Sequence, residues 1–151
     1  MFRGVTSINV DDKGRVAMPT RYRDPLRLHA QSQLVVTIDT EERCLLIYPM
    51  PEWEEIEQKV EALPSFNRAA RRVQRLLIGH ATEANLDSHG RILLPQPLRE
   101  YAQLEKVVVL VGQGKKFELW DEKHWNSQRD SWLEAQAEEE DVPVDLKMLS
   151  L

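Results

Sequence analysis

Two copies of one short motif hold the residues of this sequence whose types and spacing suit the binding of an anion. Residues 11–15 read DDKGR, and residues 87–91 read DSHGR, 76 positions later (87 against 11). In each copy an aspartate stands three positions before a glycine, a spacing at which Asp side chains readily bond the backbone amides of a turn. The guanidinium of the following arginine can bind phosphate with two hydrogen bonds or bind guanine in the major groove of DNA. The predicted turn-forming residues are Asp11, Gly14, Asp87 and Gly90, with a positive φ at the two glycines.

An arginine in this position also has a less specific interpretation. It can be a solvated charge, or it can pair with the aspartate of its own turn. The repetition favours a functional role, because the turn requires the aspartate and the glycine but does not require Arg15 or Arg91. Lys13 adds a second cation to the first turn, whereas His89 takes that place in the second turn, which is therefore less basic at pH 7.

The similarity between the two halves extends past the turns. From Asn9 the chain reads NVDDKGRVAMPTRYR, and from Asn85 it reads NLDSHGRILLPQPLR. Each stretch ends in a further arginine, Arg23 or Arg99, at the same offset. A repeat of this length and order indicates a tandem duplication. We predict four segments: a first unit over 1–64, an arginine-rich connector helix over 65–81, a second unit over 82–135 and an acidic C-terminal tail over 136–151.

Both units predict a similar series of short elements. Runs of β-branched and apolar residues before a turn are typical of short strands, and proline suits the first turn of a helix. The predicted strands are 5–10, 16–19, 34–38 and 44–48 in the first half and 82–86, 92–95, 107–111 and 117–120 in the second. The predicted helices are 51–63, 67–79 and 121–140, and short helices are expected to begin at Pro19 and at the Gln96–Pro97 pair.

These elements predict an α+β fold. Units of this size rarely hold a full core alone, so the two units are expected to interlock around one shared core. Trp53 and Trp125 occupy equivalent places after the two hairpins. We expect them to be packing anchors rather than side chains that stack on nucleic-acid bases.

The net charge of −5 is an average over separate blocks. Residues 1–30 carry six Lys or Arg against three Asp or Glu, and residues 66–81 carry four arginines and no acid. In contrast, residues 50–65 sum to −4 and residues 118–151 sum to −7. A polyanion responds to the local field, which physiological salt screens over about 8 Å, so the acidic total does not exclude DNA binding.

The sequence argues against several classes of protein and site. No apolar run approaches the roughly 20 residues of a membrane span, and the first residues lack a signal-peptide pattern. The single cysteine, Cys44, forms no internal disulfide and is expected to be a small buried hydrophobe. The four histidines share no metal-ligand spacing, GQGKK lacks the spacing of a phosphate loop, and no nucleophile–base pair stands out. We expect no membrane partner, metal, cofactor, small-molecule ligand or enzymatic activity.

The opening MFRG, the DDKGR and DSHGR turns, the LLIYPMPEWEEIEQKV segment and the central RRVQRLLIGHA together resemble the MraZ family, over the chain up to about residue 135. The resemblance implies two tandem AbrB-type swapped-hairpin units, interlocked into a small pseudo-symmetric β-barrel with flanking helices. It also implies a cytoplasmic, nucleoid-associated transcriptional repressor of the division and cell-wall gene cluster that begins with its own gene. Such a protein would assemble into homo-oligomeric rings and bind tandem short G-rich repeats in double-stranded promoter DNA.

The resemblance also places the DNA contacts of the family on particular residues. The arginine of the family's first turn corresponds to Arg15, with Lys13 beside it, and the arginine of the second turn corresponds to Arg91. Arg3 lies close to the first strand and is expected to join this basic surface.

The connector arginines and the acidic C-terminal residues each allow more than one interpretation. The connector carries four arginines at helical spacing, Arg68, Arg71, Arg72 and Arg75. They suit a second DNA-binding patch or, preferably, an interface or ion pairs with the acids of residues 52–61. The rival function is a protein-interaction module related to antitoxins, in which the acidic residues 135–151 would capture a partner.

Overall fold

The computed structural model describes residues 1–135 and 143–149. It has an α+β fold, as predicted, with an antiparallel sheet and helices around it. The strands are β1 (Phe2–Asn9), β2 (Arg15–Ala17), β3 (Leu34–Ile38), β4 (Leu45–Pro49), β5 (Thr82–Glu83), β6 (Arg91–Leu93), β7 (Val107–Gly114) and β8 (Phe117–Asp121). The helices are α1 (Thr20–Ala30), α2 (Met50–Glu61), α3 (Arg68–Val73), the π-helical turn η1 (Gln74–Ile78), α4 (Gln96–Tyr101), α5 (Glu122–Ala135) and α6 (Val144–Lys147).

The two halves of the chain interlock through their strands. The main sheet has six strands in the order β1-β7-β8-β4-β3-β5, and β2 and β6 form a separate two-stranded ribbon. β1 of the first half pairs with β7 of the second half, from Phe2 opposite Gly114 to Asn9 opposite Val107. β5 of the second half pairs with β3 of the first. Each half therefore supplies a strand that completes the sheet of the other.

The six-stranded sheet is open. Its edge strands, β1 and β5, do not pair with each other within residues 1–135. β5 is only two residues long, and both residues pair with β3 at Val35 and Val36. The closed β-barrel that the resemblance implied is therefore wrong for this structure, because β5 is too short to continue the sheet toward β1.

One large core lies between the halves, as the small size of each unit predicted. Its most deeply buried members come from both repeats and include Met18, Leu26, Ile92, Leu94 and Phe117, each no more than 1% exposed. A second cluster lies around Trp53, and a third joins Cys44 to Trp120, with Trp125 packed against it. The expected packing role of the two equivalent tryptophans is therefore confirmed.

Most predicted helices and strands are present. Their observed bounds differ from the predicted ones where pairing with another strand sets the length. The first strand begins at Phe2 rather than at residue 5, because β7 offers it a ladder of eight positions. The predicted strand 82–86 shrinks to β5. The predicted helix 67–79 changes from α3 to the π-helical turn η1 within its length. Of the predicted helix 121–140, α5 accounts for the part up to Ala135, and residues 136–140 lie outside the described residues.

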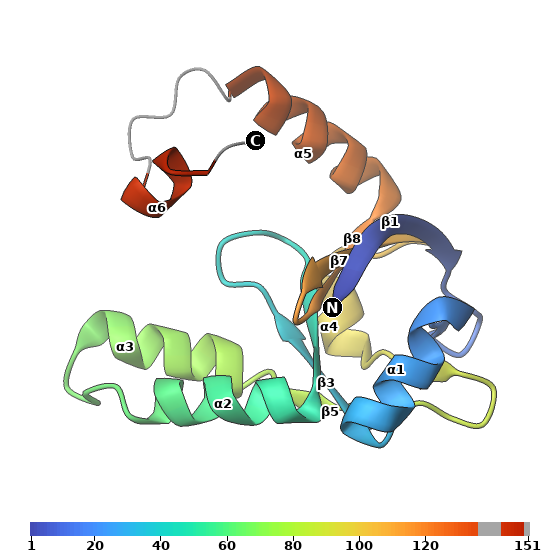
Figure 1. Ribbon diagram of the computed structural model, residues 1–151, viewed down its shortest axis with the longest axis horizontal. Helices are drawn as coiled ribbons and strands as arrows, with labels where there is room; N and C mark the ends of the chain where they lie inside the picture. Colours follow the sequence, from blue (N-terminus) through green and yellow to red (C-terminus); the bar gives the residue numbers. More distant parts are fainter. Residues whose placement is uncertain (136–142, 150–151) are drawn as a thin grey trace.

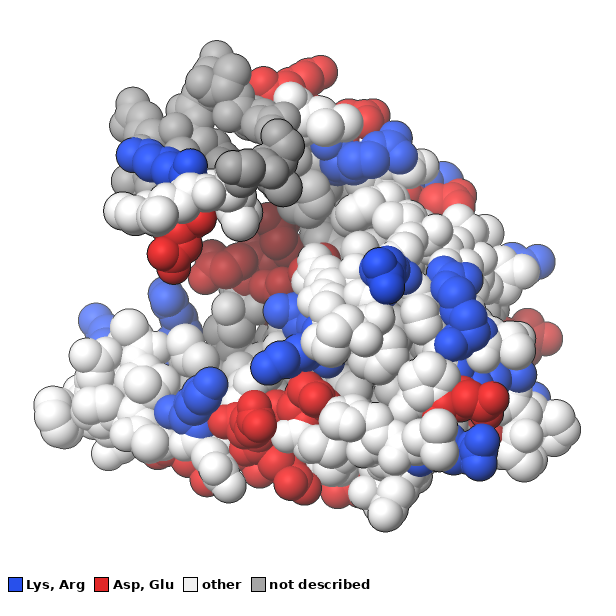
Figure 2. Space-filling model, viewed as in Figure 1, with Lys and Arg blue, Asp and Glu red and all other residues white. Residues whose placement is uncertain are grey.

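The helices are spread around the sheet (Figure 1). α1 and the two glycine turns lie at one end of the molecule, and α2 and α3 lie side by side at the other. α5 follows β8 directly and extends away from the sheet. Acidic side chains gather over α2, and basic side chains lie beside them over α3 and also on the side of α1 (Figure 2).

Candidate nucleic-acid interface

The first glycine turn is held by one carboxylate. Oδ1 of Asp11 accepts hydrogen bonds from the backbone amides of Lys13 (3.0 Å) and Arg15 (2.8 Å). Oδ2 of the same residue accepts a hydrogen bond from Nε of Arg15 at 2.8 Å. Gly14 closes the turn with a φ of 82°. One acid therefore fixes both the backbone of the turn and the base of the arginine side chain.

The second turn repeats this arrangement bond for bond. Oδ1 of Asp87 accepts from the amides of His89 (2.8 Å) and Arg91 (2.9 Å), and Oδ2 accepts from Nε of Arg91 (2.9 Å). Gly90 has a φ of 74°. The turn-forming roles predicted for the two aspartates and the two glycines match this geometry.

Both aspartates stay ionised well below neutral pH. Hydrogen bonds from the backbone amide of Arg91, followed by those of His89 and the Arg91 side chain, lower the pKa of Asp87 to about 2, although desolvation opposes them. The equivalent bonds from Arg15 lower the pKa of Asp11. Each arginine is thus paired through Nε with a carboxylate, which is the less specific interpretation weighed above. Within the described residues, however, the terminal nitrogens of Arg15 have no hydrogen-bond partner.

The β2–β6 ribbon brings the two arginines together. Arg15 lies opposite Leu93, and Ala17 lies opposite Arg91. These four residues share one face of the ribbon, because side chains alternate between the two faces of a strand. The α-carbons of diagonal neighbours of this kind are about 7–8 Å apart, and each arginine side chain runs from there to the aspartate of its own turn.

The opposite face of the ribbon anchors it to the protein. Val16 and Ile92, at the centre of β2 and β6, are 2% and 1% exposed and belong to the main core. On the outer face Leu93 is 57% exposed. The outer face thus carries two arginines together with Ala17 and Leu93, and a two-stranded ribbon is an element that the major groove of DNA can admit.

The other predicted contacts are distributed unevenly around this ribbon. Lys13 and His89 are exposed within the two turns, at equivalent positions. Arg3 is exposed near the start of β1, opposite Gln113 of β7. The turn begins beyond the other end of that strand, roughly 25 Å away for an extended chain. The structure thus groups Arg15, Arg91 and Lys13, and it places Arg3 apart from them.

The sequence model of the MraZ protein family, which its description likens to antitoxins, matches this chain twice, over residues 1–76 and 77–143. The chain belongs to the MraZ family. The two matches divide the chain near the boundary between the two repeats and together span nearly all of it.

Curated MraZ relatives match over the full length of both chains. The protein from Coxiella burnetii is 60% identical, that from Halorhodospira halophila 56%, and that from Legionella pneumophila 55%. All three are named transcriptional regulator MraZ. The family is thus one of regulators rather than enzymes, in agreement with the expectation from the sequence. Among the helices within residues 1–135 and 143–149, none has the length and apolar character needed to cross a membrane.

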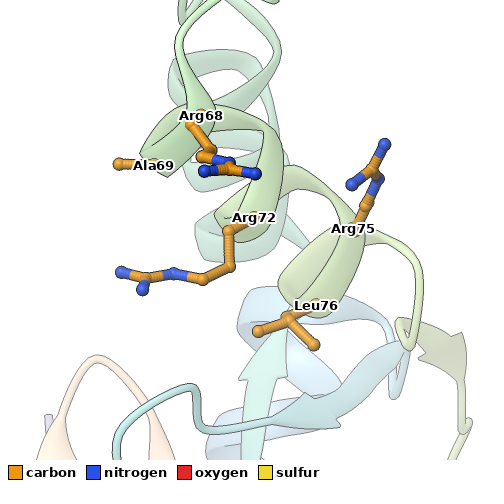
Figure 3. A pocket seen from close by; sticks show the side chains of 5 residues that line it. All are labelled: Arg68, Ala69, Arg72, Arg75 and Leu76. Atoms are coloured by element: carbon orange, nitrogen blue, oxygen red, sulfur yellow. The ribbon is translucent and has the colours of Figure 1, made fainter.

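The connector arginines of this MraZ chain do not make the predicted ion pairs. Within residues 1–135 and 143–149, none of the four lies within ion-pair distance of an acidic group. Three of them line an open hollow of about 580 Å³ together with Ala69 and Leu76 (Figure 3). Ion pairing with the acids of residues 52–61 is therefore wrong, because the helix turns these side chains to the surface instead. The interface and second-patch interpretations stay predictions.

One partly buried cluster offers ligand types that metals use. Ligand atoms of Asp39, Cys44 and Glu118 lie within 4.8 Å of one another. Burial raises the pKa of the Cys44 thiol, and burial also raises the pKa of Glu118. A metal ligand must lose its proton, so these shifts oppose metal binding. The thiol instead donates a weak hydrogen bond to Asp39 (3.8 Å), as suits a small buried side chain.

Sequence reasoning gave no role to Arg23 and Arg99, although both lie against the turns. Nε of Arg23 donates to the carbonyl of Met18 (2.8 Å), and Nε of Arg99 donates to that of Leu94 (3.0 Å). The sequence did indicate that these two arginines matter, because they stand at equivalent positions of the two repeats.

Proposed function

We propose that this MraZ family member is a cytoplasmic, nucleoid-associated transcription regulator that binds double-stranded promoter DNA in a sequence-specific way. In this proposal it represses the division and cell-wall gene cluster that begins with its own gene. It recognises tandem short G-rich repeats through the D-x-x-G-R turns of a homo-oligomeric ring. The names of the relatives support the regulatory part, and the remaining parts follow from the family resemblance.

The observation that carries the proposal is the placement of Arg15 and Arg91 on one face of the β2–β6 ribbon. Each arginine is held at Nε by an ionised aspartate. A guanidinium fixed in this way loses little conformational entropy when it binds. Each guanidinium suits a guanine, whose O6 and N7 atoms accept two hydrogen bonds from arginine.

One ribbon alone would bind weakly. It offers few cations to the phosphates, and non-specific binding of that kind is weak at physiological salt. A ring repeats the ribbon, and linked sites can raise the overall affinity by roughly 10²–10⁴ without any new contact. DNA repeats about 10–10.5 bp apart lie on the same side of the duplex and would meet successive subunits. Affinity should therefore depend on the number and spacing of the repeats.

The proposal is tested by fluorescence anisotropy on the promoter upstream of the chain's own gene, with a scrambled duplex of equal length, across a series of salt concentrations. Arg15→Ala should cost roughly 1–3 kcal/mol per site and erase the preference for the promoter if the guanidinium contacts a base. If it contacts only phosphate, both duplexes should weaken alike and the salt slope should fall by about one per site. Arg129→Ala, an exposed arginine of α5, is the matched control.

The same experiment addresses the rival function. Wild-type protein that shows no preference for the promoter at any salt concentration would remove DNA recognition from the proposal. The interaction module would then be the function to pursue, and deletion of residues 135–151 should abolish capture of its partner.

A further inference from the structure

Each glycine turn is covered by an arginine of the other repeat. A β-carbon placed on Gly14 would lie 2.8 Å from Cζ of Arg99, and one placed on Gly90 would lie 2.7 Å from Cζ of Arg23. Real β-carbons do not approach other atoms this closely, so the guanidinium groups occupy the space that only glycine leaves free. The glycines are therefore needed for two reasons, their positive φ and the arginine that packs on them.

A closed set of contacts holds each arginine over its turn. At the first turn, the amide of Leu94 donates to the carbonyl of Gly14 at 2.9 Å. The carbonyl of Leu94 in turn accepts a hydrogen bond from Nε of Arg99. The guanidinium of Arg99 then packs where a β-carbon of Gly14 would stand, so the second repeat holds the first turn at two points, through Leu94 and through Arg99.

The second turn has the reciprocal set. The amide of Met18 donates to the carbonyl of Gly90 at 2.8 Å, and the carbonyl of Met18 accepts from Nε of Arg23. Every member of this set lies 76 positions from its counterpart in the first set. The support of the two turns is thus exchanged between the repeats, as are the strands β1 and β5.

We infer that Arg23 and Arg99 are positioning residues, each of which fixes the DNA-contacting turn of the opposite repeat. Arg99 sets the geometry of the turn that presents Arg15, and Arg23 sets the geometry of the turn that presents Arg91. This inference rests on the proposed DNA-binding function of the turns. Each arginine positions its turn through the flat shape of its guanidinium and the hydrogen bond from its Nε. A positive charge alone is not enough for this role.

The physical reason is the position of the glycines within the turns. Gly14 directly precedes Arg15, so a change in the backbone at Gly14 moves the arginine and breaks its alignment with Asp11. Asp11, whose side chain is 37% exposed, holds the amides of Lys13 and Arg15. Arg99 packs on Gly14, between those two residues. A binding group must be held close to its productive geometry by surrounding contacts, or affinity and specificity both fall.

The first experiment needs no DNA. Amide hydrogen exchange is measured by NMR on the folded full-length chain and on the variants Arg99→Ala and Arg23→Ala. Arg99→Ala should speed exchange in residues 13–15 by about tenfold and leave residues 89–91 unchanged, because a lost local contact raises local opening. Arg23→Ala should give the opposite pattern. Each variant is the matched control of the other. Equal acceleration in both turns, or in neither, would overturn the inference.

The second experiment measures promoter preference by anisotropy in a double-mutant cycle. Arg99→Ala should reduce the preference about tenfold, as for the loss of a modest base contact, with the salt slope unchanged. Its effect should be non-additive with Arg15→Ala and additive with Arg91→Ala, because coupling marks groups that act together. Arg23→Ala should show the reverse pattern, non-additive with Arg91→Ala and additive with Arg15→Ala. A fall of the salt slope by about one per site would instead identify a direct phosphate contact and sink the positioning role.

A conservative variant separates shape from charge. Arg99→Lys keeps the positive charge but lacks the Nε donor and the flat guanidinium, so it should not restore promoter preference. Full rescue by lysine would overturn the inference. If the wild-type protein shows no promoter preference, the proposed function fails, whereas the exchange experiment still decides whether the repeats support each other's turns.

Discussion

Phe2 of β1 stacks on Phe117 of β8, with their ring centroids 4.4 Å apart, and thereby joins the first strand of one repeat to the last strand of the other. Tyr22 of α1 meets both rings edge to face, at 5.8 Å and 5.0 Å. This aromatic trio lies where the two halves meet, and Phe117 is fully buried. The trio thus adds an aromatic contact to the core and the strand pairing that join the two halves.

The first prediction concerns this contact. Phe117→Ala should lower the free energy of unfolding by about 3–5 kcal/mol, because it removes a buried ring and leaves a cavity. Chemical denaturation followed by tryptophan fluorescence measures the change. Phe66→Ala is the matched control, since Phe66 is 90% exposed and its removal should change little. Equal losses in the two variants would mean that the aromatic trio does not hold the halves together.

Much of this arrangement could be predicted from the sequence, and the reasons differ between its parts. The aspartate and glycine of each turn encode local geometry, which is why the positive φ at Gly14 and Gly90 was foreseen. The strand 34–38 was predicted with its observed bounds because its run of apolar residues is buried along its whole length. The bounds of elements that are stabilised by a distant part of the chain were harder to predict. β1 gains Phe2 only through its long pairing with β7.

The candidate site shows the same division between local and distant contacts. The pairing of Arg15 with its own aspartate was among the interpretations weighed, because those residues are neighbours. The alignment of Arg15 and Arg91 on one ribbon depends on the pairing of β2 with β6, which no local pattern specifies. The ion pairs expected for the connector arginines were wrong, because helical spacing does not say which face of a helix meets the protein.

The second prediction concerns pH. The lowered pKa of Asp87 means that its ionised form stabilises the folded state above the ordinary pKa of 3.8 and that this contribution is lost as the pH falls toward about 2. Asp87→Asn should therefore be less stable than the wild type at neutral pH, and the difference should narrow between about pH 4 and pH 2. Thermal melts across this range measure the difference. A gap that is as large at pH 2 as at pH 7 would contradict the assignment.

The third prediction concerns the single cysteine. Cys44 is fully buried, and burial raises the pKa of its thiol, so almost no thiolate is present at neutral pH. A thiol reagent should leave the native protein unlabelled and should modify one group per chain after unfolding in guanidinium chloride. Mass spectrometry counts the labels. Native protein that reacts as fast as the unfolded chain would show that the site opens readily.

The fourth prediction concerns the connector arginines that line the hollow in Figure 3. If they form an interface between subunits, replacing Arg68, Arg72 and Arg75 together by alanine should shift the sedimenting species to lower mass. Binding to a duplex with a single repeat should change by less than about twofold, as expected of surface substitutions away from the contact. Lys59→Ala on α2 is the control. A large loss of single-repeat binding with unchanged mass would favour a second DNA patch.

The exchange of strands between the repeats also affects how the fold responds to dilution. A chain with only one repeat could complete its sheet only by pairing with another molecule, and its stability would then depend on protein concentration. Here both partners are parts of one chain. The chain can therefore stay folded at any dilution without a second molecule. If it assembles as proposed, its subunits can separate and rejoin without unfolding.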